Sequence, residues 1–259
     1  GGEPGLVRAW EVLRTAPEII RTNTTVLESM SKLIRHNLIE NVGGATSSQL
    51  ANIHKYTALG DYLNQPMRVP ITNSIEFTDL SLPPFEYQSY RAIVDGLQQL
   101  RQTSRLETGT VLRGRPLSEA DYNRLFGSGS PQDIPVKGFV STTRNQEVAE
   151  AFANMGDFPG LRYRMIWRIK STNGVDINDL SDWGENLGSI YHADAIPPVI
   201  RNQQEVLLEE GYFRKTGEPT AILENGNPKV TFNGAGEPVY WMKVELEELG
   251  TPIRQITSQ

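Results

Sequence analysis

The chain has 259 residues, of which 38% are hydrophobic and 22% are charged, so it can bury the core of one large domain, or of one domain with a small appendage. It carries 25 Lys and Arg against 31 Asp and Glu, and this acidic balance argues against a broad electrostatic grip on nucleic acid. Cysteine is absent and the three histidines (His36, His54 and His192) lie far apart, which excludes disulfides and thiolate catalysis and argues against a metal site.

No apolar run approaches the roughly 18 residues that a membrane span needs, so we expect no membrane span. No signal peptide is visible, and the chain begins with Gly1. We therefore expect a processed fragment or an excised domain of a larger protein.

The first third of the sequence has helical periodicity. Apolar residues recur at helical spacing over residues 6–13, and capping boxes at Thr15–Glu18 and Thr25–Glu28 predict two helix starts. Residues 41–48 (NVGGATSS) form a polar, glycine-rich linker. We therefore divide the chain into an N-terminal helical extension, residues 1–47, and a second domain, residues 48–259.

Two further helices are predicted over Ile53–Met67 and Tyr90–Leu100, with an irregular segment over Pro70–Pro84 between them. After residue 108 the pattern changes to short β-rich runs. The predicted strands are Thr110–Leu112, Gly138–Ser141, Tyr163–Ile169, Glu205–Leu208 and Val239–Leu246.

Among these strands, a helix is predicted over Glu119–Phe126 after Ser118, and another over Gln146–Asn154 after a Thr143-x-x-Gln146 capping box. The turn-rich segments 224–228 and 233–238 predict a hairpin or meander near the end. Helices first and antiparallel-type strands later indicate an α+β fold.

Three strand ends in this half of the chain carry polar residues suited to chemistry. Arg113 and Gly114 follow the first strand, Ser141-Thr142-Thr143 follow the second, and Gln203 and Glu205 stand two residues apart at the start of a third. The phosphate-loop, dinucleotide-fingerprint and nucleophile-elbow motifs are missing.

The three segments, in this order, resemble the Arg, Ser-Thr-Ser and Gln/Glu-x-Glu motifs of the R-S-E class of mono-ADP-ribosyltransferase toxins, which includes the clostridial Rho-modifying exoenzymes. Thr143 departs from the third position of the Ser-Thr-Ser motif but keeps the hydroxyl. The segment from His54 to Arg68 also resembles the family's helical segment, and residues 173–177 resemble a later family pattern. The resemblance spans roughly residues 48 to 248.

This resemblance implies an ADP-ribosyltransferase-like split antiparallel β-sandwich around an NAD cleft, with NAD as co-substrate and no metal. Cleavage of the nicotinamide–ribose bond passes through a state like the oxocarbenium ion of glycoside cleavage. Arg113 would then bind the NAD diphosphate or ribose oxygens, Ser141 would orient Glu205, and Glu205 would bind the ribose and counter the developing positive charge. Gly114, Thr142 and Thr143 would shape the NAD pocket.

Gln203 indicates which kind of acceptor group the enzyme would modify. Arginine-modifying members of the class carry Glu at this position, whereas Gln cannot act as a base, so we expect an acceptor other than arginine. The resemblance places an acceptor loop over residues 194–202, with Tyr191 and Ile196 as candidate contacts. It also places a diphosphate–nicotinamide loop over residues 154–162, where Arg162 would add a phosphate contact and Phe158 would cover nicotinamide. Phe139 is expected in the core.

Several alternatives stay open at this stage. The same residues would serve a transferase with a macromolecular acceptor or an NAD glycohydrolase, and a third possibility is a binding domain without activity. Taken singly, Arg113 is compatible with a surface arginine on an edge strand, Ser141 with a residue that only precedes the helix cap at Thr143, and Glu205 with a solvent-facing strand residue. The acceptor would be a host protein such as actin or a small GTPase, with nucleic acid less expected. We expect a toxin or effector that is secreted, or delivered into the cytoplasm of a target cell.

Overall fold

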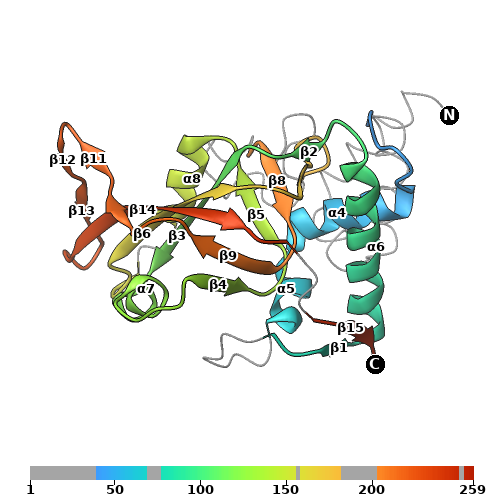
Figure 1. The fold of residues 1–259 in the computed structure, drawn as a ribbon, viewed down its shortest axis with the longest axis horizontal. Helices are drawn as coiled ribbons and strands as arrows, with labels where there is room; N and C mark the ends of the chain where they lie inside the picture. Colours follow the sequence, from blue (N-terminus) through green and yellow to red (C-terminus); the bar gives the residue numbers. More distant parts are fainter. Residues whose placement is uncertain (1–38, 69–76, 156–157, 182–202, 251–253) are drawn as a thin grey trace.

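The structure is a computed structural model that describes residues 39–68, 77–155, 158–181, 203–250 and 254–259 (Figure 1). The helices predicted over residues 6–34 and the acceptor loop 194–202 lie outside the described residues, as does Tyr191. Those three predictions therefore stay untested.

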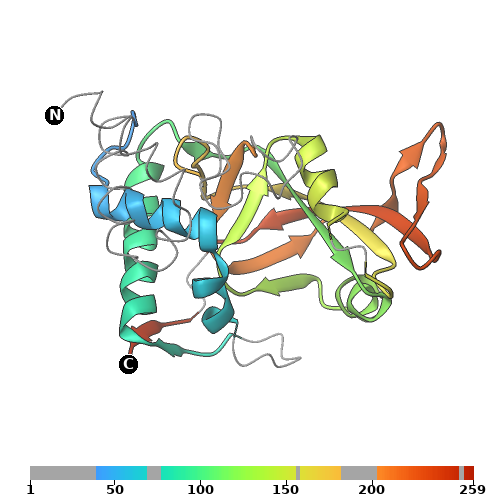
Figure 2. The same cartoon turned by 180° about the vertical axis from the view of Figure 1, so that it is seen from behind.

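Helices α4 (Ser47–Leu59), α5 (Asp61–Met67) and α6 (Pro84–Arg101) form one layer beside the sheet, as Figures 1 and 2 show. The helix predicted over Ile53–Met67 differs in two respects: it starts already at Ser47, inside the expected linker, and it is interrupted at Gly60. The early start follows from a capping box, because Thr46 Oγ1 accepts from the Gln49 backbone N at 3.1 Å and Gln49 Oε1 accepts from the Thr46 N at 2.9 Å. The interruption coincides with glycine, a poor helix former.

Of the predicted N-terminal extension, the structure describes residues 39–47, and these pack on this helical layer. Ile39 and Val42 contact the buried cluster formed by α4, α6 and the sheet. Arg105 donates to the backbone oxygens of Glu40, at 2.6 Å, and Asn41, at 3.0 Å. Residues 39–46 are therefore attached to the body of the domain.

Eleven of the described strands form one large sheet with the order β2-β7-β8-β5-β3-β6-β14-β9-β4, in which the short strands β10 and β13 pair with β14. The central strands are β3 (Thr110–Leu117), β5 (Val140–Thr143), β6 (Tyr163–Lys170), β8 (Glu205–Leu208) and β14 (Pro238–Glu248). The outer strands are β2 (Leu106–Glu107), β4 (Asp133–Val136), β7 (Gly174–Asp176), β9 (Gly211–Lys215), β10 (Thr220–Ala221) and β13 (Val230–Phe232). Within this sheet β6 and β14 pair in parallel, and the other pairs are antiparallel.

The sheet divides between β3 and β5. These two strands share one register pair, Leu112 with Thr143, whereas β3 pairs with β6 along all of Thr110–Leu117. The strand predicted to end at Leu112 therefore continues for five residues, because β6 provides a partner along its whole length. On each side of the division the sheet curls around a common core, which gives the split sandwich that the resemblance implied.

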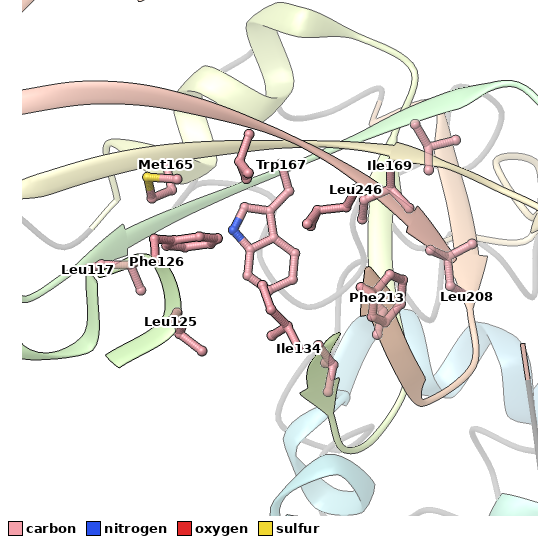
Figure 3. Close-up of a cluster of buried hydrophobic side chains, with 14 of the residues drawn as sticks. Leu117, Leu125, Phe126, Ile134, Met165, Trp167, Ile169, Leu208, Phe213 and Leu246 are labelled. Carbon is pink, nitrogen blue, oxygen red and sulfur yellow. The ribbon is translucent and has the colours of Figure 1, made fainter. Parts of the chain in front are cut away.

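The core between the two halves is centred on Trp167 (Figure 3). This residue of β6 contacts Phe126 and Phe213, with ring centroids 6.2 and 6.5 Å apart. The cluster also takes Val140, Val206 and Leu208 from β5 and β8, so both halves of the sheet contribute to it. Burial of these apolar side chains is the main force that closes the sandwich.

Two helices follow strands of the sheet. Helix α7 (Glu119–Phe126) begins after Ser118, whose side chain accepts from the Asp121 backbone N, and this prediction is confirmed. Helix α8 (Gln146–Ala153) is also confirmed, but its N-cap is Asn145 and not Thr143. The Thr143 hydroxyl donates to the backbone oxygen of Gln203 and accepts from the Asn145 backbone N at 3.0 Å, while Asn145 Oδ1 accepts from the Glu147 backbone N at 2.9 Å.

The C-terminal part contains the predicted turns. Residues 224–228 lie in the hairpin of β11 (Leu223–Glu224) and β12 (Asn227–Pro228), and residues 233–238 join β13 to β14. This arm projects from the body of the domain (Figure 1). The segment predicted as irregular contains β1 (Leu80–Leu82), which pairs in parallel with β15 (Ile256–Ser258), a partner too distant in sequence to be recognised locally. In the part of the chain that the structure describes, no helix combines the length and apolar character of a membrane span.

Candidate active site

Arg113 lies at the point where the sheet divides, one residue after Leu112. Its Nη1 donates to the Ser141 backbone oxygen at 3.0 Å, across the gap between β3 and β5. Its buried Nε has no hydrogen-bond partner among the described residues. Burial lowers the pKa of Arg113 to about 9, and the positive charge of Arg115 acts in the same direction. The guanidinium is still charged at neutral pH, so a buried cation with an unused donor is available to an anionic ligand.

The three hydroxyls of β5 have different partners. Thr142 donates to the Val206 backbone oxygen at 2.6 Å, and Thr143 donates to the Gln203 backbone oxygen. These two side chains therefore hold β5 to the segment that carries Glu205. The side chain of Ser141 lowers the pKa of the Glu205 carboxyl and that of the Tyr56 hydroxyl, against the effect of burial on both. Of the three, Ser141 alone connects directly to the candidate catalytic carboxylate.

Glu205 is the first residue of β8 and pairs in register with Thr143. Ser141 is two residues from Thr143, so Ser141 and Glu205 lie on the same face of the sheet. The Glu205 side chain is 2% exposed, and its Oε2 accepts from Ser181 Oγ at 2.7 Å. Burial raises the pKa of Glu205 to about 7, although the hydrogen bonds from Ser181 and Ser141 oppose this rise. Such a carboxyl changes its charge near neutral pH.

The sequence pattern suggested that Gln203 opens the third strand. In the structure Gln203 lies before β8, which begins at Glu205. The strand begins at Glu205 because Gln204 has a φ of 46°, in the left-handed region, where strand pairing stops. The Gln203 side chain is buried, at 6% exposure, and lines a small cavity of about 160 Å³ together with Gly114, Thr143 and Phe152. The amide and the carboxylate therefore face different surroundings.

A larger cavity of about 720 Å³ opens beside the division of the sheet. Arg113 and Ser141 line it from the strands, and both also line the smaller cavity, so the two cavities adjoin. The opposite wall comes from α4 and α5. The residues of that wall are Tyr56, Thr57, Ala58, Gly60, Tyr62, Asn64 and Arg68. The volume lies in the range of small-molecule and cofactor sites.

A hydrogen-bond network joins the helical wall to the strands. Asn64 Nδ2 donates to the Tyr56 hydroxyl at 2.7 Å, and the Phe139 backbone N donates to Asn64 Oδ1 at 2.9 Å. Tyr56 in turn contacts Ser141. Gly138 has a φ of 84°, and a Cβ there would meet Asn64 Oδ1 at 2.6 Å, so glycine allows this close approach. The sequence segment from His54 to Arg68 had pointed to these helices, but not to the contact with Ser141.

Two more arginines line the cavities together with Arg113. Arg68 lines the larger cavity, and its Nε donates to the Lys137 backbone oxygen at 3.3 Å. Arg115 shares a face of β3 with Arg113, since it is two residues further along the strand. Desolvation in the concave site, followed by the positive charge of Arg68, lowers the pKa of Arg115, although its side chain keeps access to solvent. The site is therefore electropositive and suits a ligand with negative charge on more than one group.

Gly114 has a packing role in addition to its place in the small cavity. A Cβ at this position would lie 1.7 Å from the Ala149 backbone oxygen, so helix α8 can lie against β3 only if residue 114 is glycine. Phe139 is 2% exposed and belongs to the core that the helices share with the sheet, as expected, and it also lines the larger cavity.

Arg162 and Phe158 lie away from this network. Arg162 Nε donates to the Pro238 backbone oxygen at 2.6 Å, and its guanidinium lies 5.8 Å from the ring centre of Tyr240. Phe158 is 67% exposed. Neither residue lines either of the two cavities described above. A contact of Arg162 with NAD stays a prediction that the Pro238 and Tyr240 contacts do not support.

Carboxylates and histidines do not gather into a metal site. Among the described residues, no group of three or more His, Asp or Glu side chains is arranged to hold a metal ion. The charged groups that line the two cavities are the three arginines Arg68, Arg113 and Arg115, which suit an anionic organic ligand.

No protein-family model and no curated protein sequence matches the chain. Several solved structures do match it. The type III effector XopAI from Xanthomonas axonopodis pv. citri, as a form truncated by 70 N-terminal residues, aligns with a TM-score of 0.51 at 14% identity over 94% of this chain and 88% of its own. Exoenzyme S from Pseudomonas aeruginosa, in complex with human 14-3-3 protein beta and carba-NAD, aligns with a TM-score of 0.49 at 15% identity, over 93% of this chain and 89% of its own.

The Vis toxin, an ADP-ribosyltransferase from Vibrio splendidus, aligns with a TM-score of 0.47 at 15% identity over 97% of this chain and 88% of its own. At 14 to 15% sequence identity, structural similarity shows a shared fold alone. The chain shares its α+β fold with XopAI, and the predicted α+β class is confirmed.

Proposed function

We propose that the chain is an NAD-dependent mono-ADP-ribosyltransferase of the R-S-E class. The observation that carries this proposal is that Arg113 and Ser141 line the 720 Å³ cavity together, and that Ser141 also acts on the buried carboxylate of Glu205, which itself lines neither cavity. Arg113 and Glu205 are 92 residues apart in the sequence (205 − 113), and the split sheet brings them to one site. This arrangement combines a phosphate-binding cation and a buried carboxylate on either side of one serine.

The electropositive wall suits the NAD diphosphate. Arg113 has a buried Nε without a partner, and Arg68 and Arg115 add positive charge close by. Guanidinium groups bind phosphate oxygens through forked, charge-assisted hydrogen bonds. The smaller cavity, which Phe152 and Gly114 line, has room for a flat ring such as nicotinamide.

The reaction breaks the bond between ribose C1′ and the nicotinamide nitrogen, and the electron pair leaves with nicotinamide. Positive charge then develops on the ribose, as in glycoside cleavage. The Glu205 carboxylate counters this charge in a site from which water is largely excluded, where electrostatic stabilisation is strongest. The acceptor forms the new bond to C1′ and loses a proton. Nothing in this sequence of steps requires a metal.

We infer further that the acceptor group is not arginine. Gln203 has no carboxylate with which to take a proton from a guanidinium, and its amide offers one donor group and one acceptor. Its buried position beside Thr143 and Phe152 suits recognition of an amide, a hydroxyl or the edge of a base.

The acceptor, the place of action and the division into domains are also proposals. We propose a macromolecular acceptor in a target cell, a host protein such as actin or a small GTPase, because a net charge of −6 disfavours nucleic acid. XopAI is described as a type III effector, and delivery into a host cytoplasm, or secretion, is proposed for this chain as well. Residues 48–259 would form the catalytic domain, and residues 1–47 a helical extension.

The test combines the purified protein with labelled NAD and a lysate of target cells. Label retained on a macromolecule supports the transferase, and free ADP-ribose alone indicates an NAD glycohydrolase with water as the acceptor. Glu205→Ala should abolish either reaction. Glu245→Ala is the matched control, since Glu245 is an exposed carboxylate on β14 that pairs with Arg168. Failure of the wild type to consume NAD would overturn the proposal and leave a binding domain without activity.

A further inference from the structure

A second serine reaches the candidate catalytic carboxylate from outside the three sequence motifs. Ser181 Oγ donates to Glu205 Oε2 at 2.7 Å, and Ser181 is completely buried. It lies in the turn that follows β7, 24 residues before Glu205 in the sequence. Ser141, on β5, also lowers the pKa of this carboxyl through its side chain. Two hydroxyls from two separate elements therefore act on Glu205, and that of Ser181 is the one at 2.7 Å.

The turn that carries Ser181 is fastened to the start of β8. The Ile177 backbone N donates to the Glu205 backbone oxygen at 3.1 Å, and Asn178 Oδ1 accepts from the Glu205 backbone N at 3.4 Å. Within the turn, the backbone N groups of Leu180 and Ser181 both donate to the Ile177 oxygen, at 2.9 and 2.8 Å. The backbone of Glu205 and the hydroxyl of Ser181 are therefore held in one local unit.

Arg105 fastens the same turn from behind. Its two terminal nitrogens bond to the two carboxylate oxygens of Asp179, at 2.6 and 2.7 Å, and Nη1 also donates to the Asp176 backbone oxygen at 3.1 Å. The Arg105 side chain is largely buried, at 8% exposure. From α4, a ring nitrogen of His54 lies 3.0 Å from the Leu180 backbone oxygen. A turn held from two sides places the Ser181 hydroxyl with little freedom.

We propose that Ser181 is a positioning residue of the candidate active site, which fixes the Glu205 carboxylate relative to Ser141 and Arg113. This inference rests on the proposed function. A carboxylate that counters charge in a transition state acts only if its orientation is set beforehand. A single hydrogen bond from Ser141 leaves rotation about the Glu205 side chain possible, whereas a second donor on the other element removes it.

The surroundings of Glu205 show why a second donor matters. Burial raises the pKa of the carboxyl, and the hydroxyls of Ser181 and Ser141 hold it down to about 7. The other titratable groups that face this region are Tyr56 and His54 on α4 and Arg113 on β3. Asp176 and Asp179, behind the turn, bond to Arg144 and Arg105. Loss of the Ser181 hydroxyl therefore favours the protonated carboxyl, which cannot counter a positive charge.

The first test measures the carboxyl itself and does not depend on activity. Side-chain carboxyls of glutamate are labelled with ¹³C in the full chain and titrated by NMR, and Glu205→Gln identifies the Glu205 signal. In Ser181→Ala we expect the midpoint of this signal to rise by about one pH unit, the effect of one lost hydrogen bond to a charged group. Ser171→Ala is the matched control. It removes another buried hydroxyl, bonded to the Glu107 backbone oxygen and not to Glu205.

The second test measures turnover of NAD against pH with the same variants. For Ser181→Ala we expect kcat to fall on the order of tenfold, the acid limb of the pH profile to move upward, and KM for NAD to change less than about threefold. Ser171→Ala should keep the wild-type profile, whatever it does to thermal stability. An unchanged Glu205 midpoint in Ser181→Ala, or an equal shift in both variants, overturns the role of Ser181. If the wild type consumes no NAD, the proposed function fails, and the NMR titration still decides whether Ser181 holds the carboxylate.

Discussion

Arg113 Nη1 donates to the backbone oxygen of Ser141 at 3.0 Å, across the point where β3 and β5 separate. The two residues are 28 positions apart in the sequence (141 − 113), and they belong to the two halves of the divided sheet. The contact uses one end of the guanidinium and leaves the buried Nε without a partner among the described residues.

Glu205→Ala should lower kcat by about 10²- to 10³-fold, the usual cost of losing a group that stabilises charge in the transition state. KM for NAD should change little, because the carboxylate acts mainly after binding. Steady-state measurement of nicotinamide release gives both constants. Glu245→Ala, on an exposed face of β14, should behave like the wild type. A Glu205 variant with near-normal turnover would contradict the mechanism.

Arg113→Lys should weaken NAD binding by about tenfold or more, because an ammonium group cannot make the forked contact of a guanidinium. Calorimetric titration with NAD measures the change. Arg168→Lys is the matched control, since Arg168 pairs in register with Leu112 on the neighbouring strand and its guanidinium contacts Glu245 at the surface. Equal affinities for the two variants would show that Arg113 does not hold the diphosphate.

Glu205→Gln should stabilise the folded protein at pH 8. The pKa of Glu205 is raised from 4.5 to about 7 in the folded state, so the folded state binds this proton more tightly than the unfolded chain. The contribution of Glu205 to the free energy of unfolding therefore declines as the pH rises from about 4.5 to 7, and it stays low above pH 7. The variant removes the charge, and we expect a gain on the order of 2 to 3 kcal/mol at pH 8, with little difference at pH 4. Urea unfolding at both pH values tests this, and a variant less stable than the wild type at pH 8 would contradict it.

Gly114→Ala should destabilise the fold by about 3 kcal/mol or more, because the new Cβ would overlap the Ala149 backbone oxygen at 1.7 Å and push α8 away from β3. Thermal unfolding detects the loss. Gly217→Ala serves as the control, since a Cβ there meets no atom within 4 Å. A Gly114 variant with normal stability but weak NAD binding would assign this residue to the ligand instead of to packing.

Arginine and its analogue agmatine should be poor acceptors for the wild type, because the neutral amide of Gln203 cannot take up a proton from a guanidinium. The modification on the natural target should resist neutral hydroxylamine, which releases ADP-ribose from arginine. Gln203→Glu should raise labelling of agmatine at the expense of the natural acceptor. Efficient agmatine labelling by the wild type is the result that would disprove this inference.

Much of the fold and of the site can be predicted from sequence alone, where the causes are local. Ser118 caps α7, and the helix spans the predicted residues 119–126, because the cap and the backbone group that it satisfies lie in the same turn. The change from helical to strand-type periodicity identified the α+β class. Arg113, Ser141 and Glu205 were singled out because the segments that carry them resemble, in order, the three motifs of the R-S-E class.

The tertiary structure decided which residues meet. The Thr143 hydroxyl, expected to cap α8, joins β5 to the Gln203 backbone oxygen 60 residues away and accepts from the Asn145 backbone N, and Asn145 caps the helix. Ser181 reaches Glu205 only because the turn after β7 is fastened to β8. The pairing of β1 with β15 likewise joins segments 176 residues apart in the sequence. Such contacts form when distant segments close around a shared core, and the free energy that selects them comes from that packing, which no local pattern records.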